Sequence, residues 1–185
     1  QDLYTGRQQE YIDDAVRLLR SQGVSVERYY VSAGFGVVAE DDLLPPYEVT
    51  FSGMNAEAVR TRAARLNIPR DIERLLTDST YDIVFLPMGK RYYRSIDVDE
   101  AVRRITPDRI GVVFNRELVD RQYDNIVSVP ARTEDAKCHN TIVIGLKGLY
   151  LKNFATNLSA VDAIDPDLVS ELCRRIETTQ TVLPD

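Results

Sequence analysis

The residues best suited to recognise a ligand are tyrosines that stand next to basic side chains. Tyr92 and Tyr93 lie between Lys90, Arg91 and Arg94. An aromatic ring can stack on a nucleobase while a neighbouring cation holds a phosphate. Tyrosines near strand ends can equally pack on the core with only the hydroxyl exposed. This stretch therefore indicates either a nucleotide-binding site or part of the core.

Carboxylates and one amide are the candidate catalytic groups, namely Asp2, Asp42, Glu48 and Asn115. Acidic residues on loops are usually only solvated, but a carboxylate beneath a pocket can act as a general base. Cleavage of an N-glycosidic bond needs an oriented water and stabilisation of a developing sugar cation, and it needs no metal. An enzyme acting on a nucleobase or nucleoside, such as an N-glycosylase on modified DNA, is therefore one candidate function.

Several other chemistries lack the residues that they require. The single histidine, His139, is adjacent to Cys138, and neighbours in a regular strand or helix cannot both point at one metal. No G-x-S-x-G elbow presents a serine, and no GxxxxGK[ST] loop is present. We expect no metal and no cofactor, and we expect Cys138 and Cys173 to be reduced.

Glycines and prolines surround a second candidate site. Gly34 and Gly36 occur in SAGFGVV, and Pro45 and Pro46 directly precede Tyr47. Glycine permits a sharp turn and a close approach of backbone to ligand, while the prolines would fix the loop that presents the tyrosine. The alternative is that the glycines only accommodate a tight connection.

Charge is segregated along the chain, although the net charge of −6 argues against indiscriminate coating of DNA. Residues 1–58 carry a net charge of −6, residues 59–116 carry +4, and residues 117–185 carry −4. A local basic face within an acidic protein remains compatible with nucleic-acid binding. The alternative is a solvated surface of mixed charge. The residues predicted to form the basic face are Arg60, Arg62, Arg65, Lys90, Arg91 and Arg94.

Alternating strands and helices must position these groups. Apolar spacing predicts helices over 8–21, 55–66, from Pro69 onwards, over 97–105 and from Asp165 to Ile176. Strands are predicted at 26–32, 81–87, 110–114, 125–129 and 141–146, with 81–87 buried on both faces. The pattern predicts an α/β fold, with a mainly parallel or mixed central sheet flanked by helices, in a single domain over residues 1–185. The chain has no apolar run long enough to span a membrane, so we expect a soluble, cytoplasmic protein.

Four stretches in order resemble the YaaA-like family of peroxide-stress proteins and related domains of unknown function. They are DLYTG (2–6), SAGFGVV (32–38), PPYEVTFSGM (45–54) and FLPMGKRYYRSID (85–97). The resemblance covers roughly the first hundred residues. The positions that match the family one by one are Tyr4, Thr5, Gly6, Ser32, Gly36, Pro46, Tyr47 and Tyr93.

The resemblance implies a ligand site built from these residues with Gly34, and a protein that binds double-stranded DNA in a stress or DNA-damage response. It implies no settled catalytic residues. Family members begin with a hydrophobic strand, so we expect that a first strand precedes Gln1. The candidate functions are therefore DNA binding first, nucleobase chemistry second, and an interaction module of a larger assembly third.

Overall fold

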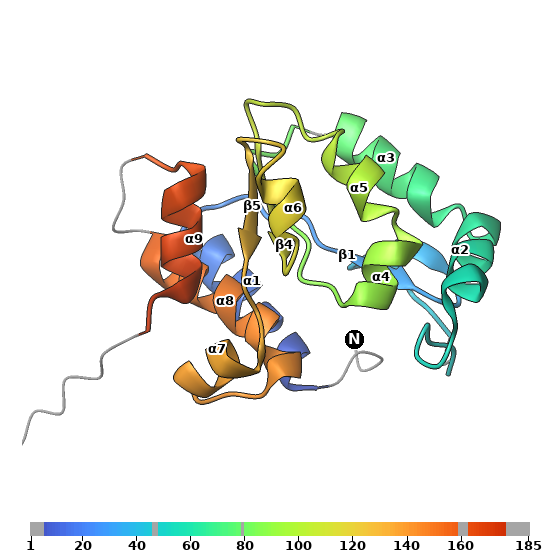
Figure 1. Ribbon diagram of the computed structural model, residues 1–185, viewed down its shortest axis with the longest axis horizontal. Helices are drawn as coiled ribbons and strands as arrows, with labels where there is room; N and C mark the ends of the chain where they lie inside the picture. Colours follow the sequence, from blue (N-terminus) through green and yellow to red (C-terminus); the bar gives the residue numbers. More distant parts are fainter. Residues whose placement is uncertain (1–5, 46–47, 79, 159–162, 177–185) are drawn as a thin grey trace, which may run out of the picture.

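A parallel three-stranded sheet forms the centre of the fold. β4 (Ile110–Phe114) lies between β3 (Ile83–Phe85) and β5 (Ile126–Val129). The structure is a computed structural model that describes residues 6–45, 48–78, 80–158 and 163–176. Figure 1 shows the helices in two groups, one on each side of this sheet. The α/β fold predicted from the sequence is thus confirmed.

The sheet separates two hydrophobic clusters because successive strand residues point to opposite faces. Val113 and Ile126 belong to one cluster, whereas Val112, Phe114 and Val127 belong to the other. All five side chains are buried. The central strand is therefore covered on both faces, as expected for a parallel sheet.

The first cluster lies beneath the helices on the right of Figure 1. These elements are α2 (Ala56–Arg65), α3 (Ile68–Asp78), α4 (Lys90–Ser95) and α5 (Val98–Val102), and the short α6 (Glu117–Asp120) joins β4 to β5. Asn55 caps the N-terminus of α2, and its side chain accepts a hydrogen bond from the Ala58 amide. Phe51 and Ile68 are fully buried in this cluster.

The second cluster is covered by the helices on the left of Figure 1. These are α1 (Arg7–Ser21), α7 (Thr133–Cys138), α8 (Val143–Asn157) and α9 (Pro166–Arg174). α1 packs closely on α8 because Gly148 has no side chain. A Cβ at Gly148 would press on the carbonyl oxygen of Gln8 and lie 3.1 Å from the Cβ of Tyr11.

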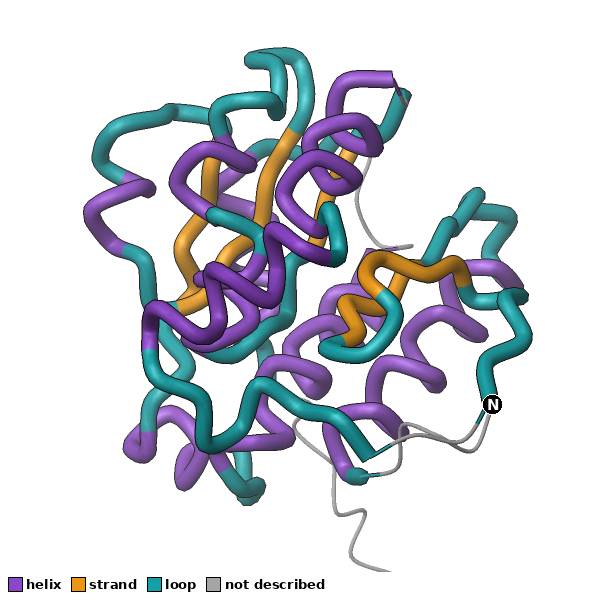
Figure 2. The backbone as a smooth tube through the Cα atoms, turned by 90° about the vertical axis from the view of Figure 1, so that its right-hand side faces the viewer, coloured by secondary structure: helices purple, strands orange, loops and turns teal. Residues whose placement is uncertain are grey.

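A separate antiparallel hairpin joins α1 to the rest of the fold. It consists of β1 (Tyr29–Ser32) and β2 (Gly36–Ala39), and Figure 2 shows it apart from the parallel sheet. The Ser32 hydroxyl accepts hydrogen bonds of 3.1 Å from the amides of Gly34 and Phe35 in the turn. Gly36 has φ of +87°, and a Cβ there would lie 2.8 Å from the carbonyl oxygen of Leu66. Glycine is therefore required at this position by both its dihedral angle and its packing.

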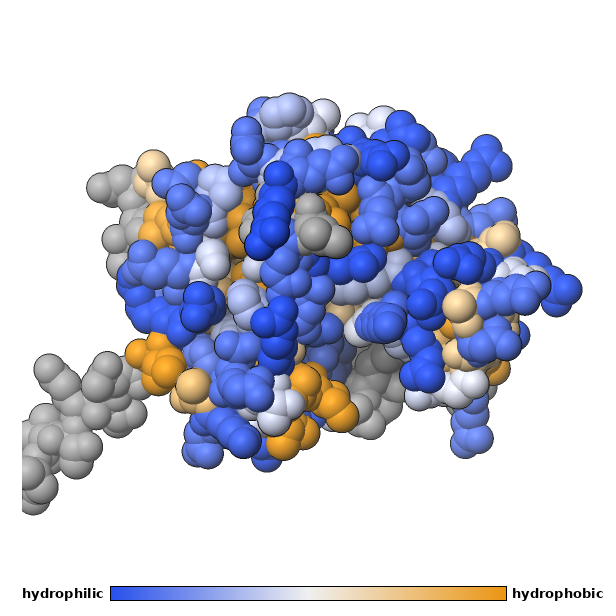
Figure 3. Space-filling model, viewed as in Figure 1, coloured by the Kyte–Doolittle hydropathy of each residue, from blue (hydrophilic) through white to orange (hydrophobic). Residues whose placement is uncertain are grey.

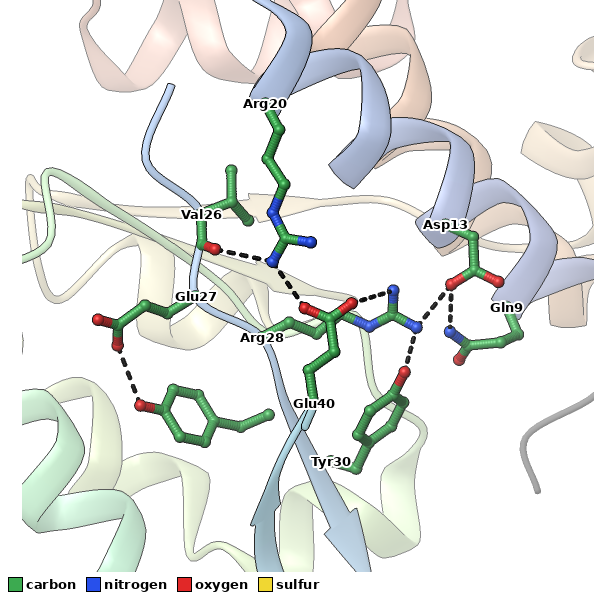
Figure 4. A network of polar contacts seen from close by, with 9 residues as sticks. Gln9, Asp13, Arg20, Val26, Glu27, Arg28, Tyr30 and Glu40 are labelled. Carbon is green, nitrogen blue, oxygen red and sulfur yellow. Dashed lines mark hydrogen bonds and ion pairs between the residues drawn. The ribbon is translucent and has the colours of Figure 1, made fainter. Parts of the chain in front are cut away.

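A polar network fixes the hairpin to α1 (Figure 4). The guanidinium of Arg28 lies between Asp13, at 2.6 Å, and Glu40, at 3.4 Å. Arg20 of α1 binds the other oxygen of Glu40 at 2.6 Å. Only 12% of the Arg28 side chain is exposed, so its two carboxylate partners replace the water that it lost on folding.

Most of the predicted elements agree with the structure to within a few residues, and two predictions were wrong. Residues 141–146 are not a strand, because α8 begins at Val143. The strand predicted at 81–87 is confined to 83–85 and is half-buried, since β3 lies at the edge of the sheet. Among the described residues, no helix combines the length and the apolar character needed to cross a bilayer.

Candidate functional site

A cavity of about 700 Å³ opens beside the end of β4, between α4 and α5 on one side and α8 on the other. Phe114, Asn115 and Arg116 contribute to it from the end of β4, and Lys147 contributes from α8. We call it the carboxyl-edge cavity, because it adjoins the carboxyl end of the central parallel strand. Ligands of open α/β sheets bind outside this end of the strands, and the volume lies within the range of small-molecule sites.

Cations outnumber carboxylates among the described residues that line the carboxyl-edge cavity. The cations are Arg60, Lys90, Arg94, Arg116 and Lys147, and the carboxylates are Asp97 and Asp99. This local excess of positive charge occurs in a protein with a net charge of −6. Figure 3 shows that hydrophilic residues dominate the face of the molecule seen in Figure 1. The cavity is therefore suited to an anionic ligand.

Lys147 is the most unusual of these cations, because it interrupts the apolar run of a helix that is largely buried. Its ammonium group donates a hydrogen bond to the carbonyl oxygen of Met88. It also lies 5.6 Å from the ring centroid of Tyr93 and 6.0 Å from that of Phe114. Burial lowers the pKa of Lys147 to about 8, since removal from water disfavours the charged form.

Arg116 faces the same aromatic ring. Its guanidinium carbon lies 5.6 Å from the Tyr93 centroid, and one Nη binds Asp99 at 3.3 Å. The Nε of Arg116 is buried and has no hydrogen-bond partner among the described residues. A buried donor without an acceptor costs free energy, so the position of this guanidinium is stabilised by its other contacts.

Two hydrogen bonds to the backbone hold the hydroxyl of Tyr93 in place. The hydroxyl donates to the carbonyl oxygen of Leu86 at 2.8 Å and accepts from the amide of Phe114 at 2.8 Å. β3 pairs with β4 only as far as Val112, so Tyr93 satisfies a β4 amide that β3 does not reach. Burial raises the pKa of this phenol well above its usual value. Tyr93 thus lines the cavity as a rigid wall, with its hydroxyl already occupied.

Asn115 lies at the cavity in a left-handed conformation, with φ of +56°. Its side-chain amide donates to the Ala131 carbonyl at 3.0 Å, and its side-chain oxygen accepts from the Ala131 amide at 2.7 Å. These two bonds hold the loop after β5 against the end of β4. Among the described candidate catalytic residues, only Asn115 lines the cavity. Both the nitrogen and the oxygen of its side-chain amide are already hydrogen-bonded to Ala131.

The other predicted site residues are dispersed or undescribed. Asp42 accepts a hydrogen bond from the Ala39 amide at 2.7 Å, and Glu48 is exposed; neither lines the cavity. Ser32, Gly34 and Gly36 form the hairpin turn, and Gly6 precedes α1. The residues that lie outside the described ranges are Asp2, Tyr4, Thr5, Pro46 and Tyr47.

The predicted basic face is divided by the fold. Arg60, Lys90 and Arg94 reach the carboxyl-edge cavity. The other three predicted members do not line it: Arg62 donates to the Ala33 carbonyl, Arg91 donates to the Met54 carbonyl at 3.2 Å, and Arg65 is exposed. Three of the six residues predicted to form the basic face therefore line the carboxyl-edge cavity.

Sequence reasoning missed Arg116 and Lys147, which come from segments outside the predicted basic face. A signal for each was present. Arg116 follows the strand predicted at 110–114, and ligand sites of α/β sheets lie at such strand ends. Lys147 is a single charge within the apolar run TIVIGLKGLYL, and charged residues are rarely buried without a role or a partner.

Comparisons of the chain with protein-family models, with curated proteins and with solved structures found no match.

Proposed function

We propose that this protein binds nucleic acid, with DNA as the first candidate, and that a phosphate of the bound strand occupies the carboxyl-edge cavity. The observation that carries the proposal is the convergence on one cavity of five cations, which come from α2, α4, α8 and the loop after β4. Arginine and lysine at such a position bind phosphate oxygens by charge-assisted hydrogen bonds.

The size of the carboxyl-edge cavity, about 700 Å³, supports a nucleotide over a simple inorganic anion. Tyr93 and Phe114 do not provide a stacking face, because their side chains are only 4% and 1% exposed and belong to the core. The resemblance to YaaA-like proteins belongs to the same proposal, and with it a role in a stress or DNA-damage response.

Salt dependence of DNA binding tests the proposal. We expect the protein to bind labelled single-stranded or duplex DNA at about 50 mM salt and more weakly at about 200 mM. Arg94→Ala removes one phosphate contact, so the slope of log affinity against log salt should become shallower by about 1. Fluorescence anisotropy titrations over this range of salt measure both quantities.

Arg17→Ala is the matched control, because it removes the same charge from α1, where the side chain is 75% exposed and away from the cavity. We expect its salt slope to equal that of the wild type. An absence of binding at low salt would reject the proposal, and equal losses in both variants would assign the effect to net charge alone.

An N-glycosylase acting on modified DNA is the second candidate, and the carboxylates of the cavity favour it. Asp97 and Asp99 both line the cavity beside the cations. Asp97 and Asp99 would then supply the carboxylate that orients water or stabilises the sugar cation.

Release of free base distinguishes this second candidate from binding alone. DNA carrying a panel of modified bases is incubated with the protein and analysed for free base and abasic sites. We expect Asp97→Asn to lower release by about a hundredfold, the scale of a lost general base. If no base is released across the panel while DNA still binds, the enzymatic candidate is excluded.

A further inference from the structure

The side chain of Lys147, which lines the carboxyl-edge cavity, differs in its surroundings from an ordinary phosphate-binding lysine. Lys90 and Arg94 extend from α4, and Lys90 is exposed to solvent. Lys147 instead projects from the largely buried α8, beside the rings of Tyr93 and Phe114. It lines the same cavity as the other four cations.

The hydrogen bond to Met88 orients this nitrogen without protonating it. A backbone carbonyl accepts one N–H of Lys147, and a neutral amine keeps its lone pair after such a bond. Among the described residues, no carboxylate contributes to the pKa of Lys147, which burial lowers to about 8. Part of the population is therefore neutral near pH 7.5, as covalent catalysis by lysine requires.

We propose that Lys147 forms an imine with the aldehyde carbon of a phosphate-bearing deoxyribose, as presented by an abasic site in DNA. The inference rests on the proposed function, because the cations are taken to hold the flanking phosphates. A nucleotide without its base leaves room beside the sugar, and its ring-opened form exposes the aldehyde at C1′.

The reaction balances without an oxidant or a metal. The lone pair of Lys147 Nζ attacks the aldehyde carbon, a C–N bond forms, and the carbonyl electrons move to oxygen. The nitrogen loses its protons through water to that oxygen, which departs as water and leaves a C=N bond. Hydrolysis reverses the step, so the adduct becomes permanent only when an added hydride donor reduces the imine to a secondary amine.

Reductive trapping tests the proposal with two probes. The protein is incubated with cyanoborohydride and either a single-stranded oligonucleotide carrying one abasic site or free 2-deoxyribose 5-phosphate. Gel electrophoresis measures the DNA adduct, and peptide mass spectrometry locates the modified lysine. We expect Lys147 to be the main modified residue, and Lys147→Arg to lower the adduct yield at least tenfold.

Lys152→Arg is the matched control, since Lys152 lies on the same helix and pairs with Asp14 at 2.8 Å. Its adduct yield should equal that of the wild type. Lys147→Met provides a second variant without an amine, and thermal melting reports whether each variant is folded. Anisotropy without reductant measures the affinity of each variant for the abasic oligonucleotide, so that adduct yields are compared at equal occupancy of the protein by DNA.

The outcomes separate this inference from the proposed function. If the adducts were spread over surface lysines, the role of Lys147 would be overturned even if DNA binds. The same holds if the adduct yield of Lys147→Arg equalled that of the wild type. If deoxyribose 5-phosphate labels Lys147 but the protein does not bind DNA, the reactivity of the Lys147 amine would be supported and DNA would be rejected as its ligand. Failure of both probes to label Lys147 in the folded protein would overturn the inference outright.

Discussion

Replacing Gly148 with valine is expected to lower the free energy of unfolding by about 3 kcal/mol, the upper range for overpacked cores. A side chain at this position meets the backbone carbonyl of Gln8, and backbone cannot yield as a flexible side chain can. The added atoms would force α1 away from α8 and disturb the cluster that also contains Leu146. Urea denaturation followed by circular dichroism measures the change.

The Gly148→Ala variant tests the same contact more sharply, because the two effects predict opposite signs for its change in the free energy of unfolding. Helix propensity alone predicts that alanine stabilises a helix interior by about 1 kcal/mol relative to glycine. The contact with Gln8 predicts a loss instead. Ala64→Val in α2 is the control, since it places a β-branched residue at an exposed helical position and should cost less than about 1 kcal/mol. A stabilised Gly148→Ala variant would contradict the close packing of α1 on α8.

Tyr93→Ala is expected to destabilise the protein by about 3 to 5 kcal/mol, as for other buried aromatic residues. Tyr93→Phe should still cost about 1 to 3 kcal/mol, because it keeps the ring but leaves the amide of Phe114 without an acceptor. Thermal and urea unfolding measure both losses. DNA affinity per folded molecule should change little in Tyr93→Phe, since the hydroxyl is occupied by backbone.

Tyr92→Phe is the neighbouring control. Tyr92 packs edge-on against Phe51, with 5.2 Å between the ring centroids, and this packing does not need its hydroxyl. We expect a change within about 0.5 kcal/mol, as for substitutions that remove no key contact. If Tyr93→Phe were as mild as Tyr92→Phe, the hydroxyl would not be supporting the end of β4.

Local signals predicted the elements where one pattern dominates. The helix predicted from Asp165 begins as expected, because the Asp165 side chain accepts from the Leu168 amide and Pro166 occupies the first turn. The strand at 110–114 agrees residue for residue. Both signals depend only on neighbouring residues, so no knowledge of the tertiary structure was needed.

The wrong strand at 141–146 has a physical cause. Apolar residues occupy both buried and exposed positions at the start of α8: Leu146 is buried, whereas Ile142, Val143 and Ile144 are exposed. A short apolar run without a polar face is compatible with either a strand or a helix. Periodicity therefore fails here because the exposed positions are apolar as well.

The candidate site was predictable only in part, because its members come from distant segments. Lys90 and Arg94 were found from their proximity to Tyr93 in the sequence, and the fold places them at the cavity. Lys147 reaches the same cavity only because α8 returns to the carboxyl end of β4. No pattern within a short window encodes that crossing.

The pairing of α1 with α8 also sets an order for events during biosynthesis. Asp14 and Lys152, which form an ion pair across these helices, are 138 residues apart. At typical rates of translation, Asp14 is synthesised roughly 7 to 28 s before Lys152. During that interval the apolar face of α1, with Ala15, Val16 and Leu19, cannot be covered by α8. The contact between α1 and α8 can therefore form only after the segment between them has been synthesised.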